Sequence, residues 1–113
     1  MRKFKILLFT LLIPITLVGS KRIDGRACKV FTKNLGIIKK RLINKPGQDI
    51  GKVNHAIDFL EEITGIQSHS DGGFLGRFDP TETDYQNWLH WFKKNNAMLY
   101  WDNKEHKVKV KHG

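Results

Sequence analysis

Apolar residues at helical spacing mark residues 50–64 as one unit. One face of this segment carries Val53, Ala56, Ile57, Leu60 and Thr64. Asp49 stands where a helix needs an N-cap acceptor, and Gly65 stands where helices commonly end in the left-handed conformation. The pattern therefore predicts a helix from about Ile50 to Thr64.

A second helical pattern covers residues 82–94. Its apolar positions, spaced i, i+3, i+4 and i+7, are Tyr85, Trp88, Leu89 and Phe92. Thr81 can cap this helix through its hydroxyl, and two lysines in the last turn suit the negative end of the helix dipole. Asn95 and Asn96 are expected to close the helix in the left-handed conformation.

A third pattern, over residues 27–44, is less decisive. Its apolar positions are Phe31, Leu35, Ile38 and Leu42, which form a helical stripe. Gly36 weakens a helix by about 1 kcal/mol relative to alanine, and the β-branched residues after it leave a strand possible. Residues 21–26 read as a flexible lead-in, and Pro46-Gly47 ends the element.

Near the C-terminus the spacing of apolar residues changes from helical to alternating. Apolar residues at 99–101, a turn at Asp102-Asn103 and alternating lysine and valine over 107–111 predict a short β-hairpin, whose lysines discourage edge-to-edge pairing. We therefore expect a mainly α fold: a small helical hairpin or HEAT-like unit of two to three helices with a short C-terminal β-hairpin.

The two helices at 50–64 and 82–94 share one apolar template. A shift of 32 residues places Ala56 on Trp88 and Leu60 on Phe92. Two such helices can pack their faces together, as in one unit of a helical solenoid. The linking segment 65–80, rich in glycine, is then expected to cross the end of the pair.

The three tryptophans have different expected roles. Trp88 lies mid-face and is assigned to the core, whereas Trp91 lies some 60° around the helix, at the edge of the packed face. Trp101 is expected to cover the helix end. Trp91 is therefore the only tryptophan we consider for contact with a ligand.

The segment 65–80 is long enough to suspect a function. Phe74 and Phe78 could reach Trp91 and form an exposed apolar patch beside His69 and Arg77, which would be the surface for a protein partner. The alternative is that both phenylalanines bury fully against the helices.

Two stretches resemble known sequences. "AIDFLEEITGI" and "DYQNWLHWFKKNNAMLYWD" are similar to a group of uncharacterised exported bacterial proteins, common in Bacteroidetes, and to the end of some HEAT-like repeat proteins. The shared pattern is FLEE-x-TG-I, then W-x-x-W-(Y or F)-x-x-N and L-x-W-D, from Ala56 to Asp102. The resemblance implies a helical fold and carries over no enzymatic role.

The N-terminus has the three parts of a signal peptide: a basic start, an uncharged apolar run over 6–18 and small residues up to Ser20. We expect cleavage near Ser20 and an exported protein, periplasmic or secreted, with no transmembrane span afterwards; an uncleaved membrane anchor is the alternative. The chain then divides into a signal peptide (1–20), a basic N-terminal region (21–48) and a helical domain with the hairpin (49–113).

Charge separates these regions. Residues 21–50 carry a net charge of +7, residues 51–103 carry −4, and residues 104–113 carry +3. A basic arm and tail attract anions, and export argues against nucleic acid as the anion. The first functional hypothesis is thus an exported interaction module with a protein partner. Its alternative is an envelope-associated protein held to anionic lipid or polymer.

No residue pattern points to catalysis or to a cofactor. The single cysteine, Cys28, excludes an internal disulfide and is expected to be a free thiol rather than a lipid anchor or a link to another chain. His69 beside Asp71 falls short of the three or four ligands that zinc sites cluster. We therefore expect no enzyme, no metal and no cofactor.

Overall fold

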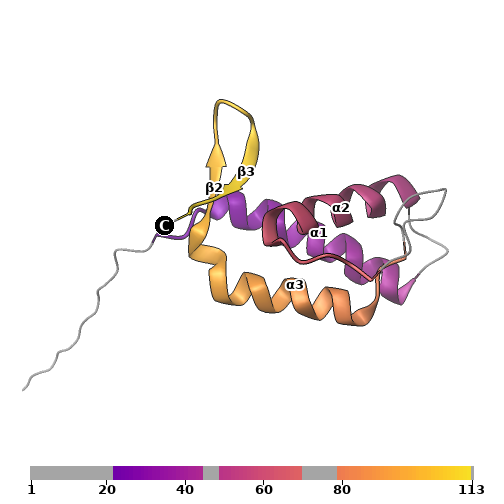
Figure 1. The fold of residues 1–113 in the computed structure, drawn as a ribbon. Coiled ribbons are helices and arrows are strands. Elements are labelled where there is room, and N and C mark those ends of the chain that lie inside the picture. Colours follow the sequence, from indigo (N-terminus) through magenta and orange to yellow (C-terminus); the bar gives the residue numbers. More distant parts are fainter. Residues whose placement is uncertain (1–21, 45–48, 70–78, 113) are drawn as a thin grey trace, which may run out of the picture.

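A computed structural model describes residues 22–44, 49–69 and 79–112 of the chain. Figure 1 shows helices with a β-hairpin standing at one end, so the expected mainly α fold with a C-terminal hairpin is confirmed. The elements in order are α1 (Gly25–Ile43), α2 (Ile50–Thr64), α3 (Glu82–Asn95), the 3-10 turn η3 (Asn96–Met98), β2 (Leu99–Asp102) and β3 (Lys107–Val110).

The ends of α2 and α3 follow from their capping residues. The Asp49 side chain accepts a hydrogen bond from the N–H of Lys52, and Gly65 closes α2 in the left-handed region with φ 75°. At α3, the Thr81 hydroxyl and the Asp84 carboxylate form a reciprocal capping box. Both predicted helix starts and the glycine stop are thus confirmed.

The basic segment, for which the sequence allowed a helix or a strand, forms the helix α1. Asp24 caps α1 by accepting from the N–H of Ala27, so the expected flexible lead-in is wrong for Gly25 and Arg26, which are helical. Gly36 lies on the exposed face, where the missing side chain leaves no gap in the packing.

The core is built around α1. Its buried apolar face supplies Ala27, Phe31, Leu35 and Ile38. Val53, Ala56, Ile57 and Leu60 of α2 join them, with Trp88 of α3 and Leu99 and Val108 of the hairpin. The basic segment and the C-terminal elements therefore share one core.

The expected face-to-face pairing of the helices at 50–64 and 82–94 is wrong. Both helices pack mainly on α1 and touch each other less. Both run antiparallel to α1 and therefore parallel to one another (Figure 1). Their shared apolar template decides which side of each helix is buried, but it does not specify the partner that covers that side.

The segment after α2 consequently takes a different path from the one expected. Ile66 lies beside Trp88, and His69 lies beside Asp84 one turn earlier in α3. Residues 65–69 thus run back along α3 between the two helices instead of crossing their end (Figure 1).

At the C-terminal end of α3 the chain tightens into η3. Asn96 has right-handed helical angles (φ −60°, ψ −27°), so the expected left-handed cap at Asn95-Asn96 is wrong. The turn carries the chain into β2, where Leu99 pairs with Val110 and Trp101 with Val108 in antiparallel register. Leu99 and Val108 are the hairpin residues that enter the core.

Candidate functional site

Trp91 lies at the edge of the core with its indole held in place. Its ring stacks on Phe31, with centroids 5.7 Å apart and planes 17° apart. Phe31 is fully buried and also stacks on Phe92 at 4.9 Å. Trp91 is partly exposed, as predicted from its position on the helix. Because its inner face rests on this aromatic group, the stacking fixes the orientation of the exposed part.

A hollow of about 380 Å³ opens beside Trp91. We call it the Trp91 hollow; its lining residues are Ile66, Asn87, His90, Trp91, Lys94 and Asn95. The lining combines apolar surface from Ile66 and the indole with two side-chain amides and a lysine. The Asn95 amide already donates to the carbonyl of Trp91 at 3.0 Å, which fixes one rim of the hollow.

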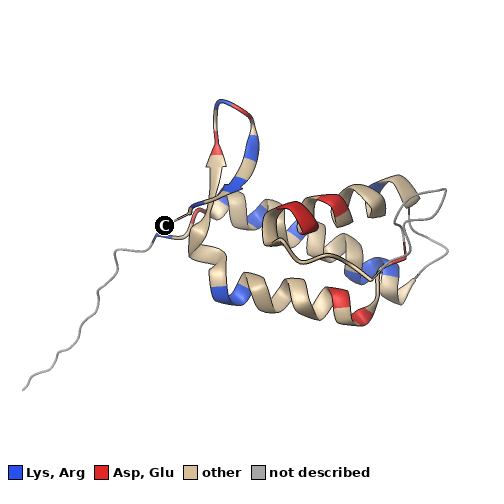
Figure 2. Ribbon diagram, in the orientation of Figure 1, with Lys and Arg blue, Asp and Glu red and all other residues tan. Residues whose placement is uncertain are grey.

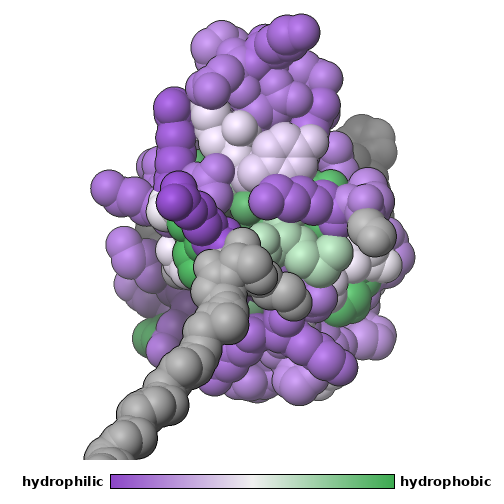
Figure 3. Space-filling model, turned by 90° about the vertical axis from the view of Figure 1, so that its left-hand side faces the viewer, coloured by the Kyte–Doolittle hydropathy of each residue, from purple (hydrophilic) through white to green (hydrophobic). Residues whose placement is uncertain are grey.

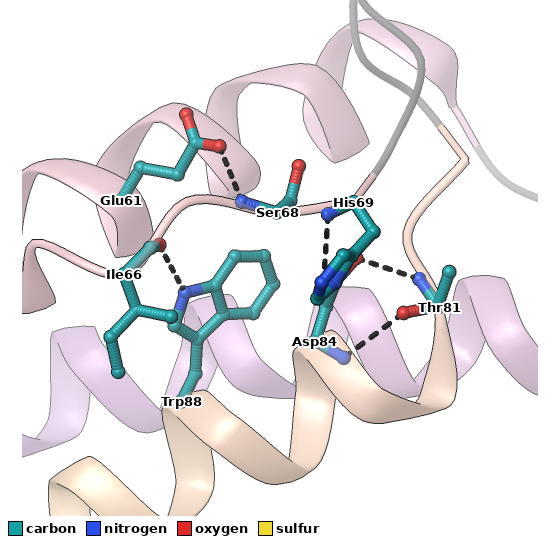
Figure 4. A network of polar contacts seen from close by, with 7 residues as sticks. All are labelled: Glu61, Ile66, Ser68, His69, Thr81, Asp84 and Trp88. Carbon is teal, nitrogen blue, oxygen red and sulfur yellow. Dashed lines mark hydrogen bonds and ion pairs between the residues drawn. The ribbon is translucent and has the colours of Figure 1, made fainter.

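The Ile66 wall depends on hydrogen bonds that tie residues 65–69 to the helices (Figure 4). The indole N–H of Trp88 donates to the Ile66 carbonyl at 3.1 Å. The Ser68 N–H donates to the Glu61 carboxylate at 2.8 Å. Core and wall are therefore connected through the side chain of the fully buried Trp88.

Asp84 fixes the far end of the same segment. Its carboxylate accepts from the N–H of Thr81 at 2.9 Å, from the N–H of His69 at 2.9 Å and faces the His69 Nδ1 at 2.8 Å. Burial opposes ionisation of Asp84, but the hydrogen bonds from Thr81 and His69 outweigh it and lower the pKa of the carboxyl. A buried carboxylate that remains charged thus anchors the segment to α3.

The His69 ring is 64% exposed at the surface, while its Asp84 partner is fully buried. A carboxylate paired with Nδ1 orients an imidazole, as in hydrolase triads, but here the same carboxylate also caps α3 and holds two backbone N–H groups. The geometry therefore accounts for a structural anchor without invoking catalysis. The described residues contain no group of three or more His, Cys, Asp or Glu arranged to hold a metal ion.

The sequence hypothesis placed five residues in one partner surface. Trp91 and His69 are described. His69 lies beside Asp84, which is two turns from Trp91 along α3, about 10 Å at 1.5 Å per residue, so the structure does not bring the two predicted residues together. Phe74, Arg77 and Phe78 lie outside the described residues.

Residues that the sequence hypothesis missed also shape the site. Phe31, 60 positions before Trp91, supplies the platform for the indole, and no local pattern could reveal that pairing. Asp84 is a second residue for which no role in a site was predicted. Its spacing from Thr81 follows the capping-box pattern and could have revealed its double role.

A larger groove of about 880 Å³ lies between α1 and α2. Val30 and Ile37 contribute apolar surface, and Lys33, Lys40 and Lys52 contribute positive charge. Basic residues gather along α1, whereas acidic residues gather on the last turns of α2 and the first turn of α3 (Figure 2). Among the described residues of segment 21–48, most of the positive charge therefore lies on α1, which borders a groove.

Comparison with known proteins returned no match to a family model, a curated protein or a solved structure. No helix within the described ranges is both long and apolar enough to cross a membrane.

Proposed function

We propose that this protein is a small interaction module that binds an apolar side chain from a protein partner in the Trp91 hollow. The observation that carries the proposal is the fixed, partly exposed indole of Trp91 beside a hollow. Aromatic residues that are rigid before binding contribute contact area at little entropic cost, which is why tryptophan is enriched at binding hot spots.

The lining of the hollow suits one side chain and its backbone. Ile66 and the Trp91 indole offer contact to an apolar group, while Asn87 and Lys94 can bond to peptide groups around it. A volume of about 380 Å³ has room for a large apolar side chain and lies near the lower end of the range for small-molecule pockets. A protein partner that inserts an anchor residue fits these dimensions.

Acrylamide quenching tests whether the indole is open to solvent. In a variant with Trp88→Phe and Trp101→Phe, Trp91 is the only emitter, and we expect acrylamide to quench it in the folded monomer. If quenching appears only after unfolding in urea, the surface does not exist and the proposal fails.

Site-specific photo-crosslinking in the native host tests for the partner. A photoreactive residue in place of His90, at the hollow, is expected to give a discrete crosslinked product. The same residue at Lys104, on the exposed hairpin turn, serves as the control. Trp91→Ala should abolish the product at position 90. Equal products at both positions, or a product unaffected by Trp91→Ala, would contradict the proposal.

Export belongs to the same proposal and rests on the N-terminal residues alone. A partner of an exported module would lie in the periplasm or outside the cell. N-terminal sequencing of the protein from its host should find a start near Lys21. Recovery of Met1 on membrane-bound protein would favour the uncleaved anchor.

A further inference from the structure

The described residues include three large apolar side chains that are exposed to solvent. Ile23 is 54% exposed, Ile43 is 75% exposed and Ile50 is 48% exposed. Ile43 is the last residue of α1 and Ile50 is the first residue of α2, so these two share the end of the molecule where α1 passes to α2. That end lies opposite the β-hairpin (Figure 1).

Exposed lysines lie on the same ends of α1 and α2 as these two isoleucines. Lys39 and Lys40 belong to the last turns of α1, and Lys52 belongs to the first turn of α2. Asp49, an acid at this end, is the N-cap of α2: its carboxylate accepts from the N–H of Lys52, and the residue also lines the groove. We call Lys39, Lys40, Ile43, Ile50 and Lys52 the α1–α2 tip.

The opposite end of the molecule has a different surface. Seen from that side, hydrophilic residues cover the hairpin, and apolar groups show mainly near its foot (Figure 3). Ile23, the remaining exposed isoleucine, belongs to the chain that leads into α1 at this end. The hairpin end can therefore serve as the control for the α1–α2 tip within the same protein.

We propose that the α1–α2 tip docks on a lipid bilayer that contains anionic lipids. Ile43 and Ile50 enter the boundary between headgroups and acyl chains, and the lysines contact the headgroup charges. The adjoining groove, with apolar Val30 and Ile37 and cationic Lys33 and Lys40, receives part of a lipid. This surface is separate from the Trp91 hollow, so either proposal can fail without the other.

The size of the tip favours a bilayer over a second protein. Stable protein interfaces bury about 800 Å² on each partner, usually around a larger apolar centre. Two isoleucines with lysines on the same helix ends offer much less apolar area. On a charged bilayer, each lysine and each buried methylene contributes separately to the binding free energy, and no complementary shape is required.

A local fluorescent probe tests the docking in the full chain. Cys28→Ala removes the native thiol, and Asn44→Cys places a nitrobenzoxadiazole probe beside Ile43, on an exposed residue. A matched chain carries the probe at Asn103→Cys in the hairpin turn, which is also exposed. Since each probe reports only its own surroundings, vesicle binding by another part of the chain does not mimic entry of the tip.

The vesicles contain phosphatidylcholine alone or phosphatidylcholine and phosphatidylglycerol in equal parts. We expect the probe at residue 44 to brighten and shift to the blue only with the anionic vesicles, while the probe at residue 103 stays unchanged. Each of Lys39→Gln and Lys40→Gln should raise the lipid concentration for half-maximal entry about fivefold, the equivalent of one cationic contact. Ile43→Ser with Ile50→Ser should raise it about tenfold or more.

Other outcomes overturn the proposal. No change at residue 44 would show that the tip does not enter lipid. Equal entry of both probes would show that entry is not specific to the tip, and insensitivity to the isoleucine substitutions would show that the two isoleucines do not mediate it. Competition by soluble glycerol phosphate at equal phosphate concentration would assign the groove to a free anion. Self-association in sedimentation velocity that Ile43→Ser and Ile50→Ser abolish would identify a second copy of the chain as the occupant.

Discussion

The carboxylate of Asp24 accepts a hydrogen bond of 2.9 Å from the backbone N–H of Trp101, 77 residues further along the chain. Its other oxygen caps α1 by accepting from Ala27 at 3.0 Å. The Arg26 guanidinium lies over the Trp101 ring, 3.9 Å from the centroid. One acidic side chain thus joins the first turn of α1 to β2. Trp101, expected to cover the end of the helix at 82–94, lies against the start of α1.

Removing this connection is expected to loosen the hairpin. Asp49→Ala is the matched control, because Asp49 caps α2 but has no distant backbone partner among the described contacts. Loss of a cap alone costs about 1 kcal/mol, which we expect for Asp49→Ala. Asp24→Ala should reduce the free energy of unfolding in urea by more. Amide hydrogen exchange at Trp101 should also accelerate in Asp24→Ala and remain unchanged in Asp49→Ala.

Trp88 and Trp91 are expected to differ in their contribution to stability. Trp88→Ala should cost about 3–5 kcal/mol, the usual range for a buried aromatic residue. Trp91→Ala should cost about 1–2 kcal/mol, from part of its buried area and its stacking on Phe31. Trp88→Phe keeps most of the packing but leaves the Ile66 carbonyl unpaired, at about 1–3 kcal/mol. Equal losses for Trp88→Ala and Trp91→Ala in urea melts would contradict this assignment.

Asp84 should be far more important than its neighbour in the same turn. Asp84→Ala leaves the N–H groups of Thr81 and His69 without their acceptor, so we expect a loss of about 3 kcal/mol or more. Glu82→Ala removes an exposed first-turn acid and should cost a few tenths of a kcal/mol. His69→Ala, which deletes an exposed ring, should cost about 0.5–1 kcal/mol. Comparable losses for Asp84→Ala and Glu82→Ala would refute the anchoring role.

The free energy of unfolding should fall in acid because carboxylates with a lowered pKa become protonated. The folded protein holds the pKa of Asp84 below its usual value of 3.8, so the unfolded chain binds protons more readily. The stabilisation is complete above pH 3.8 and is lost as the pH falls through the lower pKa of the folded state. The pKa of Asp24 is lowered likewise, by hydrogen bonds from Ala27 and then Trp101, and the Lys109 ammonium lowers that of Asp102 to about 2.

Urea midpoints measured between neutral pH and pH 2 check this dependence. The wild-type curve should descend below pH 3.8, and Asp84→Asn should begin lower but descend less steeply, because its side chain does not titrate. The same slope in both proteins would show that the Asp84 charge is not coupled to folding.

Cys28 should react slowly while the protein is folded. Burial, and then the nearby charge of Asp24, raise the pKa of its thiol, and Sγ lies 3.7 Å from the Asn96 carbonyl oxygen. Only the thiolate reacts with iodoacetamide, so alkylation near neutral pH should be roughly tenfold slower than in the urea-unfolded chain. Equal rates in the two states would mean that the cysteine is accessible.

Local structure could be read from the sequence where its cause is also local. Asp49, Gly65 and Thr81 mark helix ends because each acts on backbone groups within a few residues. The position of Trp91 at the edge of the core follows from helical phase alone. The hairpin follows from alternation and a turn signal.

Contacts between distant residues could not be read in this way. The apolar stripe of α2 is compatible with packing on α1 or on α3. Which helix covers it depends on the volume and shape of side chains such as Phe31. Asp24 looked like part of a loop because the donor that completes its role is Trp101. The groove between α1 and α2 likewise depends on how two helices meet, which periodicity does not encode.

The central place of α1 has a consequence for biosynthesis. A polypeptide emerges N-terminus first, so α1 leaves the ribosome well before Leu99 and Val108, which complete its apolar face. Until they arrive, the nascent chain exposes the side of α1 that the finished protein hides, and it remains open to chaperones and proteases. A message truncated before codon 99 would then yield a product destined for degradation.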